Sequence, residues 1–147
     1  MNIVIITDQH FGARKGAAYI NNYFQKFYDD IFFPYLKENK IDTIIDMGDT
    51  FDNRRNIDLA SLQWSKRIYF DKLQAMGIKV HIIVGNHTAY YKDTNSVNTV
   101  DLLLKEYDNV LYKHDQTYRI SSCPYHAPSY AHELPQNHST LNDPLQP

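Results

Sequence analysis

Residues 42–55 read DTIIDMGDTFDNRR, an apolar run followed directly by a polar cluster. The same order occurs twice more: residues 2–7 lead into DQH at 8–10, and residues 79–84 lead into GNH at 85–87. Short runs rich in Ile and Val are typical of buried β-strands. Because the carboxyl ends of parallel strands lie at one edge of a sheet, we expect the three clusters to converge there.

Helices are predicted between and after these runs. Apolar residues recur at helical spacing in three stretches: residues 20–31, with Ile20, Tyr23, Phe27 and Ile31 as the stripe, residues 59–76 and residues 96–107. Pro34 is expected to break or kink the first helix and to begin a second short helical piece over residues 34–39. Asn56 or Asp58 caps the helix over residues 59–76, and Gly77 ends it. The resulting β-α-β-α-β-α order, with right-handed crossovers, predicts an α/β fold with helices packed on a parallel sheet.

The C-terminal part reads differently. Residues 110–112 and 117–120 are expected to form a hairpin. Five of the six prolines follow Ser121, among polar residues without an apolar period. We therefore predict that residues 121–147 form a loose tail after an ordered part over residues 1–120.

Composition narrows the class of protein. The 147 residues make one domain, and a net charge of −2 gives no overall basic field for nucleic acid, so any DNA contact must be local. The single cysteine forms no internal disulfide and suits a reducing compartment. The only unbroken apolar stretch at the N-terminus is too short for a signal peptide or membrane span. We expect a soluble cytoplasmic protein.

The polar clusters contain metal-ligand chemistry. Asp8 and His10 are two residues apart and would leave one face of an extended chain. Asp49 follows a glycine at a predicted strand end, Asn86 offers an amide oxygen and His87 an imidazole. Each motif alone is common by chance. The metal site is predicted because all three motifs occupy equivalent positions at the ends of predicted strands. Mixed carboxylate, imidazole and amide ligands favour manganese, with iron and zinc as alternatives, and Asp49 could bridge two ions.

These clusters resemble the first three signatures of the calcineurin-like metallophosphoesterase superfamily. The surrounding sequence, GDTFDNRR at 48–55, IVGNH at 83–87 and YYKDTNSVN at 90–98, is similar to the nuclease subunits of SbcCD-type DNA repair complexes. Within that group it is most similar to the recombination endonuclease subunits of T4-like bacteriophages. The resemblance covers residues 1–112. It implies a metallophosphoesterase-like βαβαβ core, with residues 1–120 as the N-terminal part of a nuclease domain that is incomplete at its C-terminus. The implied activity is that of a metal-dependent phosphodiesterase or nuclease acting on DNA in repair or recombination.

The resemblance also implies roles for single residues. Asp8, His10 and Asp49 would bind the first Mn²⁺ ion, and Asp49 with Asn86 the second. His87 would not be a ligand but would assist the leaving oxygen. DNA would be the substrate, an SMC-like ATPase the partner subunit, and the chain a homodimer.

Two departures from the family pattern affect these roles. Thr88 stands where the family has an acid that orients the histidine, so we expect His87 to be poorly oriented and the rate to suffer. The later histidine and Gly-His-x-His turn also lack a counterpart, since no glycine follows Gly85. Three histidines of the tail are conceivable substitutes, although solvated loop residues are the simpler interpretation: His126, His132 and His138. We therefore expect weak binding of about one manganese ion.

Three functions remain open. The leading hypothesis is a DNA phosphodiesterase, in which Arg54 and Arg55 contact phosphate, although a solvated loop explains both arginines equally well. The second is a catalytically weak or silent fragment that keeps only a dimer or partner surface. The third is a small-molecule phosphoesterase, which the nuclease-like sequence around residues 52–55 and 90–98 disfavours.

Overall fold

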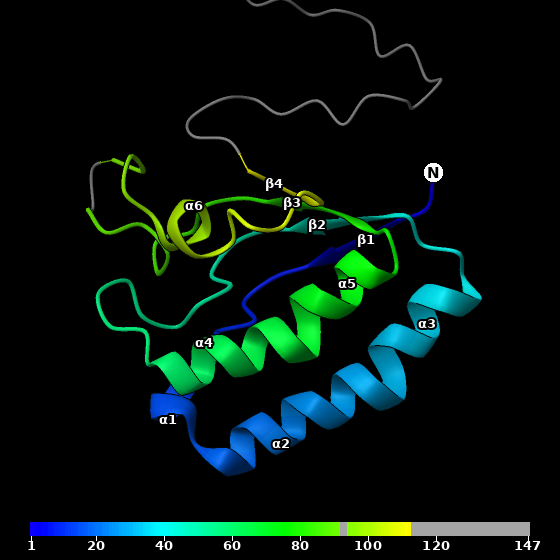
Figure 1. Ribbon diagram of the computed structural model, residues 1–147, viewed down its shortest axis with the longest axis horizontal. Helices are drawn as coiled ribbons and strands as arrows, with labels where there is room; N and C mark the ends of the chain where they lie inside the picture. Colours follow the sequence, from blue (N-terminus) through cyan, green and yellow to red (C-terminus); the bar gives the residue numbers. More distant parts are fainter. Residues whose placement is uncertain (92–93, 113–147) are drawn as a thin grey trace, which may run out of the picture.

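A computed structural model describes residues 1–91 and 94–112 of the chain. Its centre is a four-stranded sheet in the order β1-β2-β3-β4, and every neighbouring pair is parallel (Figure 1). The strands are β1 (Ile3–Ile6), β2 (Thr43–Asp46), β3 (Lys79–Ile82) and β4 (Val110–Tyr112). The predicted α/β fold and its three leading strands are confirmed.

The fourth strand forms at residues 110–112, as predicted, and pairs in parallel with β3, with Val80 opposite Val110. The hairpin with residues 117–120 stays a prediction. The chain reaches this position through a crossover that contains α6 (Thr99–Leu103), a helix shorter than the predicted 96–107. Residues 117–120 and the tail lie outside the described residues.

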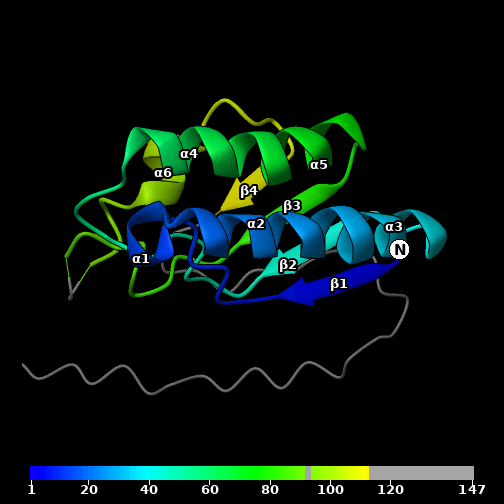
Figure 2. The ribbon, with the colours of Figure 1, turned by 90° about the horizontal axis from the view of Figure 1, so that it is seen from below.

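Two long helical units cover one face of the sheet and lie side by side (Figure 2). The first consists of α2 (Ala18–Phe27), η1 (Tyr28–Phe32) and α3 (Phe33–Glu38), and the second of α4 (Leu59–Ser65), η2 (Lys66–Phe70) and α5 (Asp71–Ala75). The short α1 (Ala13–Gly16) precedes them. The predicted cap is Asp58, whose carboxylate accepts from the Ser61 N–H, and Gly77 follows the second unit with a φ of 67°.

The predicted break of the first helix at Pro34 does not occur, while the short helical piece predicted over residues 34–39 corresponds to α3. Pro34 lies near the start of α3, directly after the π-helical η1, and the Phe33 N–H donates to the carbonyl of Tyr28. Pro34 has no N–H for the regular hydrogen-bond pattern of an α-helix, and the chain changes to the wider π-helical pattern directly before it. The chain therefore continues as a helix from residue 18 to residue 38.

The buried side of this unit matches the predicted stripe only in part. Ile20 and Phe27 are half-buried, but Tyr23 and Ile31 are 75% and 61% exposed, and Tyr28 and Phe32 are buried instead. The extra residue of a π-helical turn shifts the phase of a helix, so apolar spacing at 3.6 residues identifies the helix but not its buried side.

Only one face of the sheet is covered by helices within the described residues. Ile44 and Val80 are fully buried beneath the helices, but Ile3 and Ile5 of β1 are 38% and 67% exposed. Among the described residues β1 is an edge strand with one open face, so the prediction of a buried β1 is wrong for Ile3 and Ile5, which alternate with the half-buried Val4 and Ile6. None of the helices in the described part of the chain has the length and apolar character needed to cross a membrane.

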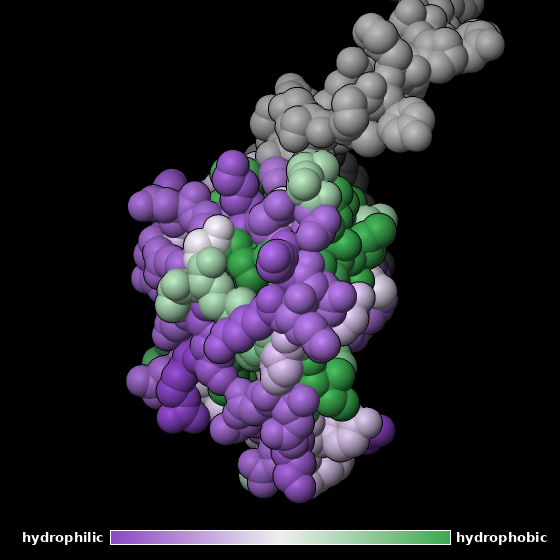
Figure 3. Space-filling view, turned by 90° about the vertical axis from the view of Figure 1, so that its right-hand side faces the viewer, coloured by the Kyte–Doolittle hydropathy of each residue, from purple (hydrophilic) through white to green (hydrophobic). Residues whose placement is uncertain are grey.

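The loops that contain the three polar clusters all lie at one end of the sheet. The end near α3 and the N-terminus has a mostly hydrophilic surface with smaller hydrophobic areas (Figure 3). The loops that follow β1, β2 and β3 lie at the opposite end, near α1 and α6 (Figure 1). The three polar clusters therefore lie at one edge.

Candidate metal centre

Two glycines bring the second and third clusters into direct contact. Gly85 leaves no room for a side chain, because a Cβ there would lie 2.2 Å from Oδ1 of Asp49 and 2.6 Å from its backbone nitrogen. Gly48 has a φ of +107°, and a Cβ there would lie 3.0 Å from the Ile83 carbonyl oxygen and 3.1 Å from the Gly85 backbone nitrogen. The His87 N–H donates to Asp49 Oδ1 at 2.9 Å. These contacts fix the Asp49 carboxylate against the GNH loop.

The first cluster is attached to the second by backbone hydrogen bonds. The Asp8 N–H donates to the Gly48 carbonyl at 3.1 Å, and the His10 N–H donates to the Asp49 carbonyl at 3.0 Å. Asp8, His10 and Asp49 all have left-handed backbones, with φ of 54°, 46° and 53°. Such conformations cost free energy in residues other than glycine and cluster at functional sites.

Asp8, His10 and Asp49 form what we call the edge group. Their candidate ligand atoms lie within 4.8 Å of one another, close enough for one divalent ion to contact all three. Asp8 is exposed, while His10 and Asp49 are half-buried. A hydrogen bond from Thr7 lowers the pKa of Asp8, and His10 lowers it further. The three side chains thus lie together as expected, and their role as ligands stays a prediction.

The surroundings of His10 fit a metal ligand. Its Nε2 lies 3.5 Å from Oδ1 of Asp8, and its Nδ1 lies 3.3 Å from Oδ1 of Asp52. This Nδ1 is buried and makes no hydrogen bond of good geometry with any described residue. Histidines that bind metals commonly direct their second nitrogen to a carboxylate, and carboxylate with imidazole donors suits manganese, iron or zinc.

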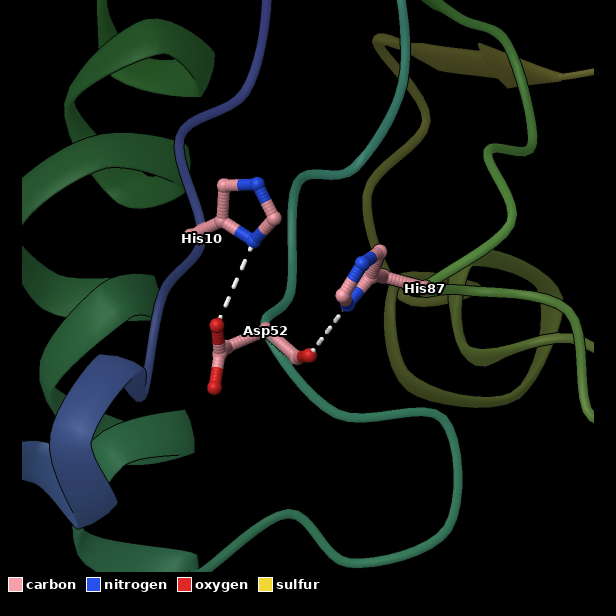
Figure 4. A group of neighbouring side chains, drawn as sticks. All are labelled: His10, Asp52 and His87. Carbon is pink, nitrogen blue, oxygen red and sulfur yellow. Dashed lines mark hydrogen bonds and ion pairs between the residues drawn. The ribbon is translucent and has the colours of Figure 1, made fainter.

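Asp52 also contacts the third cluster. His10, Asp52 and His87 form a second group whose ligand atoms lie within 4.8 Å (Figure 4). His87 Nδ1 is 2.7 Å from the Asp52 carbonyl oxygen, and the two imidazole rings meet edge to face at 4.9 Å. Asp52 is not among the predicted site residues. Its only signal was a second aspartate three residues after Asp49.

The expectation that His87 lacks an orienting partner is wrong. The backbone carbonyl of Asp52 orients its ring, so no acid is needed at position 88 for this purpose. Thr88 is fully buried, and its hydroxyl donates to the Gly85 carbonyl at 2.9 Å. Its own carbonyl accepts from the Thr99 N–H at 2.9 Å. Thr88 thereby fixes the turn that presents His87.

The remaining predicted site residues lie around this centre. Asn86 is exposed and stands between Gly85 and His87, the two residues that approach Asp49. Arg54 is half-buried and Arg55 exposed, both in the loop after β2. The tail histidines lie outside the described residues.

A separate cluster of polar side chains is buried beneath the edge group. We call it the buried group: Gln9, Tyr28, Asp46 and Thr50. Asp46 is fully buried and accepts hydrogen bonds from Gln9 Nε2 at 2.7 Å and Thr50 Oγ1 at 2.9 Å. The Gly48 N–H adds a third at 3.0 Å, and the Tyr28 hydroxyl donates to Gln9. Burial raises the pKa of Asp46 to about 6, although these hydrogen bonds oppose the shift. The sequence analysis missed this cluster.

Residues 1–139 match the family of calcineurin-like phosphoesterases. The chain belongs to this family. Over 90 residues, 60% of its length, it is 37% identical to exonuclease subunit 1 of Enterobacteria phage T4, of which it spans only 26%. The nuclease MPE of Pseudomonas putida has a TM-score of 0.45 and 19% identity, covering 76% of this chain and 46% of that one. The predicted family is confirmed.

Proposed function

We propose that this calcineurin-like phosphoesterase is a metal-dependent phosphodiesterase that cleaves DNA as a subunit of an exonuclease. The observation that carries the proposal is the grouping of Asp8, His10 and Asp49 beside His87 at the carboxyl edge of the sheet. Family membership supports phosphoester chemistry, and the phage T4 relative is named an exonuclease subunit.

Asp8, His10 and Asp49 would hold one divalent ion, for which we propose Mn²⁺. Asp49 and Asn86 would contribute to a second, weaker site, so binding near one equivalent is expected. Bound divalent ions supply water activation and charge neutralisation at phosphate oxygens. The chain contributes the placement of the carboxylates, and Asp52 positions the His10 ring through the contact at Nδ1.

His87 would act as the proton donor to the leaving oxygen. A carbonyl oxygen only accepts hydrogen bonds, so the contact between Asp52 and Nδ1 of His87 requires the proton on that nitrogen. Nε2 is therefore the nitrogen available to the substrate. When the ring is protonated, Nε2 can give its proton to the departing sugar oxygen.

The wider functional assignment rests on the resemblance to the nuclease branch. Arg54 and Arg55 would contact DNA phosphates from the loop after β2. We further propose an SMC-like ATPase as partner subunit, a homodimer, and a role in DNA repair or recombination in the cytoplasm of a bacterium or phage-infected bacterium. The division into residues 1–120 and 121–147 stays a prediction.

DNA cleavage with Mn²⁺ tests the proposal. End-labelled single-stranded and duplex DNA should be cleaved by the full chain, and EDTA should stop the reaction. Asp49→Asn removes a ligand charge but tolerates the left-handed backbone, and should slow cleavage by about a hundredfold or more. Asp30→Asn, an exposed aspartate of η1, is the matched control and should cleave normally.

Two outcomes would overturn this function. Hydrolysis of p-nitrophenyl phosphate without DNA cleavage would indicate a small-molecule phosphoesterase. Manganese binding without hydrolysis of either substrate would indicate a silent module.

A further inference from the structure

A hollow of about 520 Å³ lies between the loop that follows β2 and the loop that follows β3. Its described lining holds two cations, two aromatic rings and one amide, with no carboxylate: Asn53, Arg54, Arg55, Tyr90 and Tyr91. None of these residues belongs to the edge group, so the hollow needs its own explanation.

Hydrogen bonds from backbone N–H groups fix the two loops that form the walls of the hollow. On one side, Asn53 Oδ1 accepts from the N–H groups of Arg55 at 2.9 Å and Asn56 at 3.2 Å. On the other side, the Tyr90 N–H donates to the Val97 carbonyl at 2.9 Å, beside an antiparallel bridge from residue 89 to residue 98. The exposed side chains therefore project from anchored loops.

The same walls meet at the catalytic histidine. Asn53 directly follows Asp52, and Tyr90 comes three residues after His87. Since His87 Nδ1 is 2.7 Å from the Asp52 carbonyl, the two loops are joined where the hollow adjoins the metal centre. A substrate whose phosphate lies at His87 would have its neighbouring nucleotide within reach of this hollow.

The side chains have the chemistry of nucleotide recognition. Tyr90 and Tyr91 are 42% and 50% exposed, and their rings meet edge to face at 4.8 Å. The Arg55 guanidinium lies 5.8 Å from the Tyr90 ring centroid. Exposed aromatic rings offer stacking surfaces for bases, and arginine pairs with phosphate.

We propose that Tyr90 and Tyr91 form a stacking site for one unpaired base of a DNA strand, with Arg55 beside its phosphate. This inference rests on the proposed function, because it names the part of the DNA next to the reacting phosphate. A base within a duplex is already stacked on its neighbours and cannot enter without unpairing. The site therefore selects single-stranded DNA or frayed ends.

Binding measured without metal tests the inference. Fluorescence anisotropy in EDTA would compare the affinities of a labelled thymidine oligonucleotide and an abasic tetrahydrofuran chain of equal length. We expect the full chain to prefer the base-containing strand about tenfold, as stacking at one base allows. Tyr90→Ala should bring this ratio close to one, while Tyr90→Phe, which keeps the ring, should preserve it. Tyr23→Ala, at a 75% exposed tyrosine of α2 outside the hollow, is the matched control and should also preserve it.

An equal affinity for both strands, or a ratio that Tyr90→Ala leaves unchanged, would overturn the stacking site. Cleavage with Mn²⁺ is measured separately on the thymidine strand. Cleavage without a base preference in binding contradicts only the stacking site, whereas a base preference without cleavage contradicts only the proposed function.

Discussion

The edge group and the buried group contain similar side chains within a few residues of one another, but their environments are opposite. The Asp8 side chain is 62% exposed, whereas Asp46 is fully buried. Gln9 stands between Asp8 and His10 in sequence but is only 3% exposed. Residue type alone therefore does not identify which polar side chains at this edge are open to a ligand.

The two groups differ in the number of protein donors that bind their carboxylates. The Asp46 carboxylate accepts from three donors of the protein, which occupy much of its capacity. The Asp49 carboxylate accepts from the His87 N–H and otherwise faces the other members of the edge group. A carboxylate with spare lone pairs can bind a cation, whereas one saturated by internal donors stabilises the fold.

The largest expected effect comes from removing the carboxylate of the buried group. Asp46→Ala would leave the donors of Gln9, Thr50 and Gly48 unpaired in the interior, and should lower the free energy of unfolding by about 4 kcal/mol. Urea denaturation followed by circular dichroism measures this loss.

Asp49→Asn provides the contrast in the same experiment. The amide keeps an oxygen that can accept from the His87 N–H, and asparagine tolerates a φ of 53°. We expect stability to change by less than about 1 kcal/mol. Equal destabilisation by the two substitutions would remove the distinction between the groups.

A smaller effect is expected from the titration of Asp46. In the folded chain its pKa is raised to about 6, while the unfolded chain releases the proton near the ordinary value of 3.8. Between these values the folded state binds more protons, so stability falls as pH rises from about 4 to about 6. The contribution of this group is about 3 kcal/mol, fully present below pH 4 and lost above pH 6.

Unfolding curves across this pH range, in EDTA to exclude metal, measure that slope. Asp46→Asn, which cannot ionise, should flatten the dependence, whereas Asp30→Asn should keep it. A decrease that persists unchanged in Asp46→Asn would assign it to other groups.

Much of the fold could be predicted because its signals are local. Apolar runs identified β1, β2 and β3, and Asp58 and Gly77 carry the chemistry of helix ends. The buried side of the first helical unit could not be predicted, since the π-helical turn that sets its phase has no pattern in the sequence. The open face of β1 also depends on what packs over the sheet, which strand composition does not encode.

The candidate site divides in the same way. The meeting of Asp8, His10 and Asp49 follows from parallel topology, because their loops extend from equivalent strand ends. Asp46, in contrast, lies inside an apolar run, and its partner Gln9 is 37 residues away in sequence. Hydrogen bonds between distant residues depend on the packed structure, which explains why the buried group and the contacts of Asp52 escaped prediction.

The smallest expected change in stability comes from removing one hydroxyl of the buried group, that of Tyr28. Tyr28 is buried, and its hydroxyl donates to Oε1 of Gln9. The Nε2 group of the same glutamine donates to Asp46. Tyr28→Phe keeps the ring but leaves this oxygen unpaired, and should cost about 1 kcal/mol of unfolding free energy. Tyr35→Phe, at a 52% exposed tyrosine of α3, is the control and should cost nothing measurable, because water replaces the lost contact.

Manganese affinity, measured by calorimetry on Tyr28→Phe, should equal that of the unaltered chain, because the buried group supports the fold and not the ligands. A loss of metal binding that exceeds the loss of stability would mean that Gln9 transmits the position of Tyr28 to Asp8 and His10. The two groups would then act as one site.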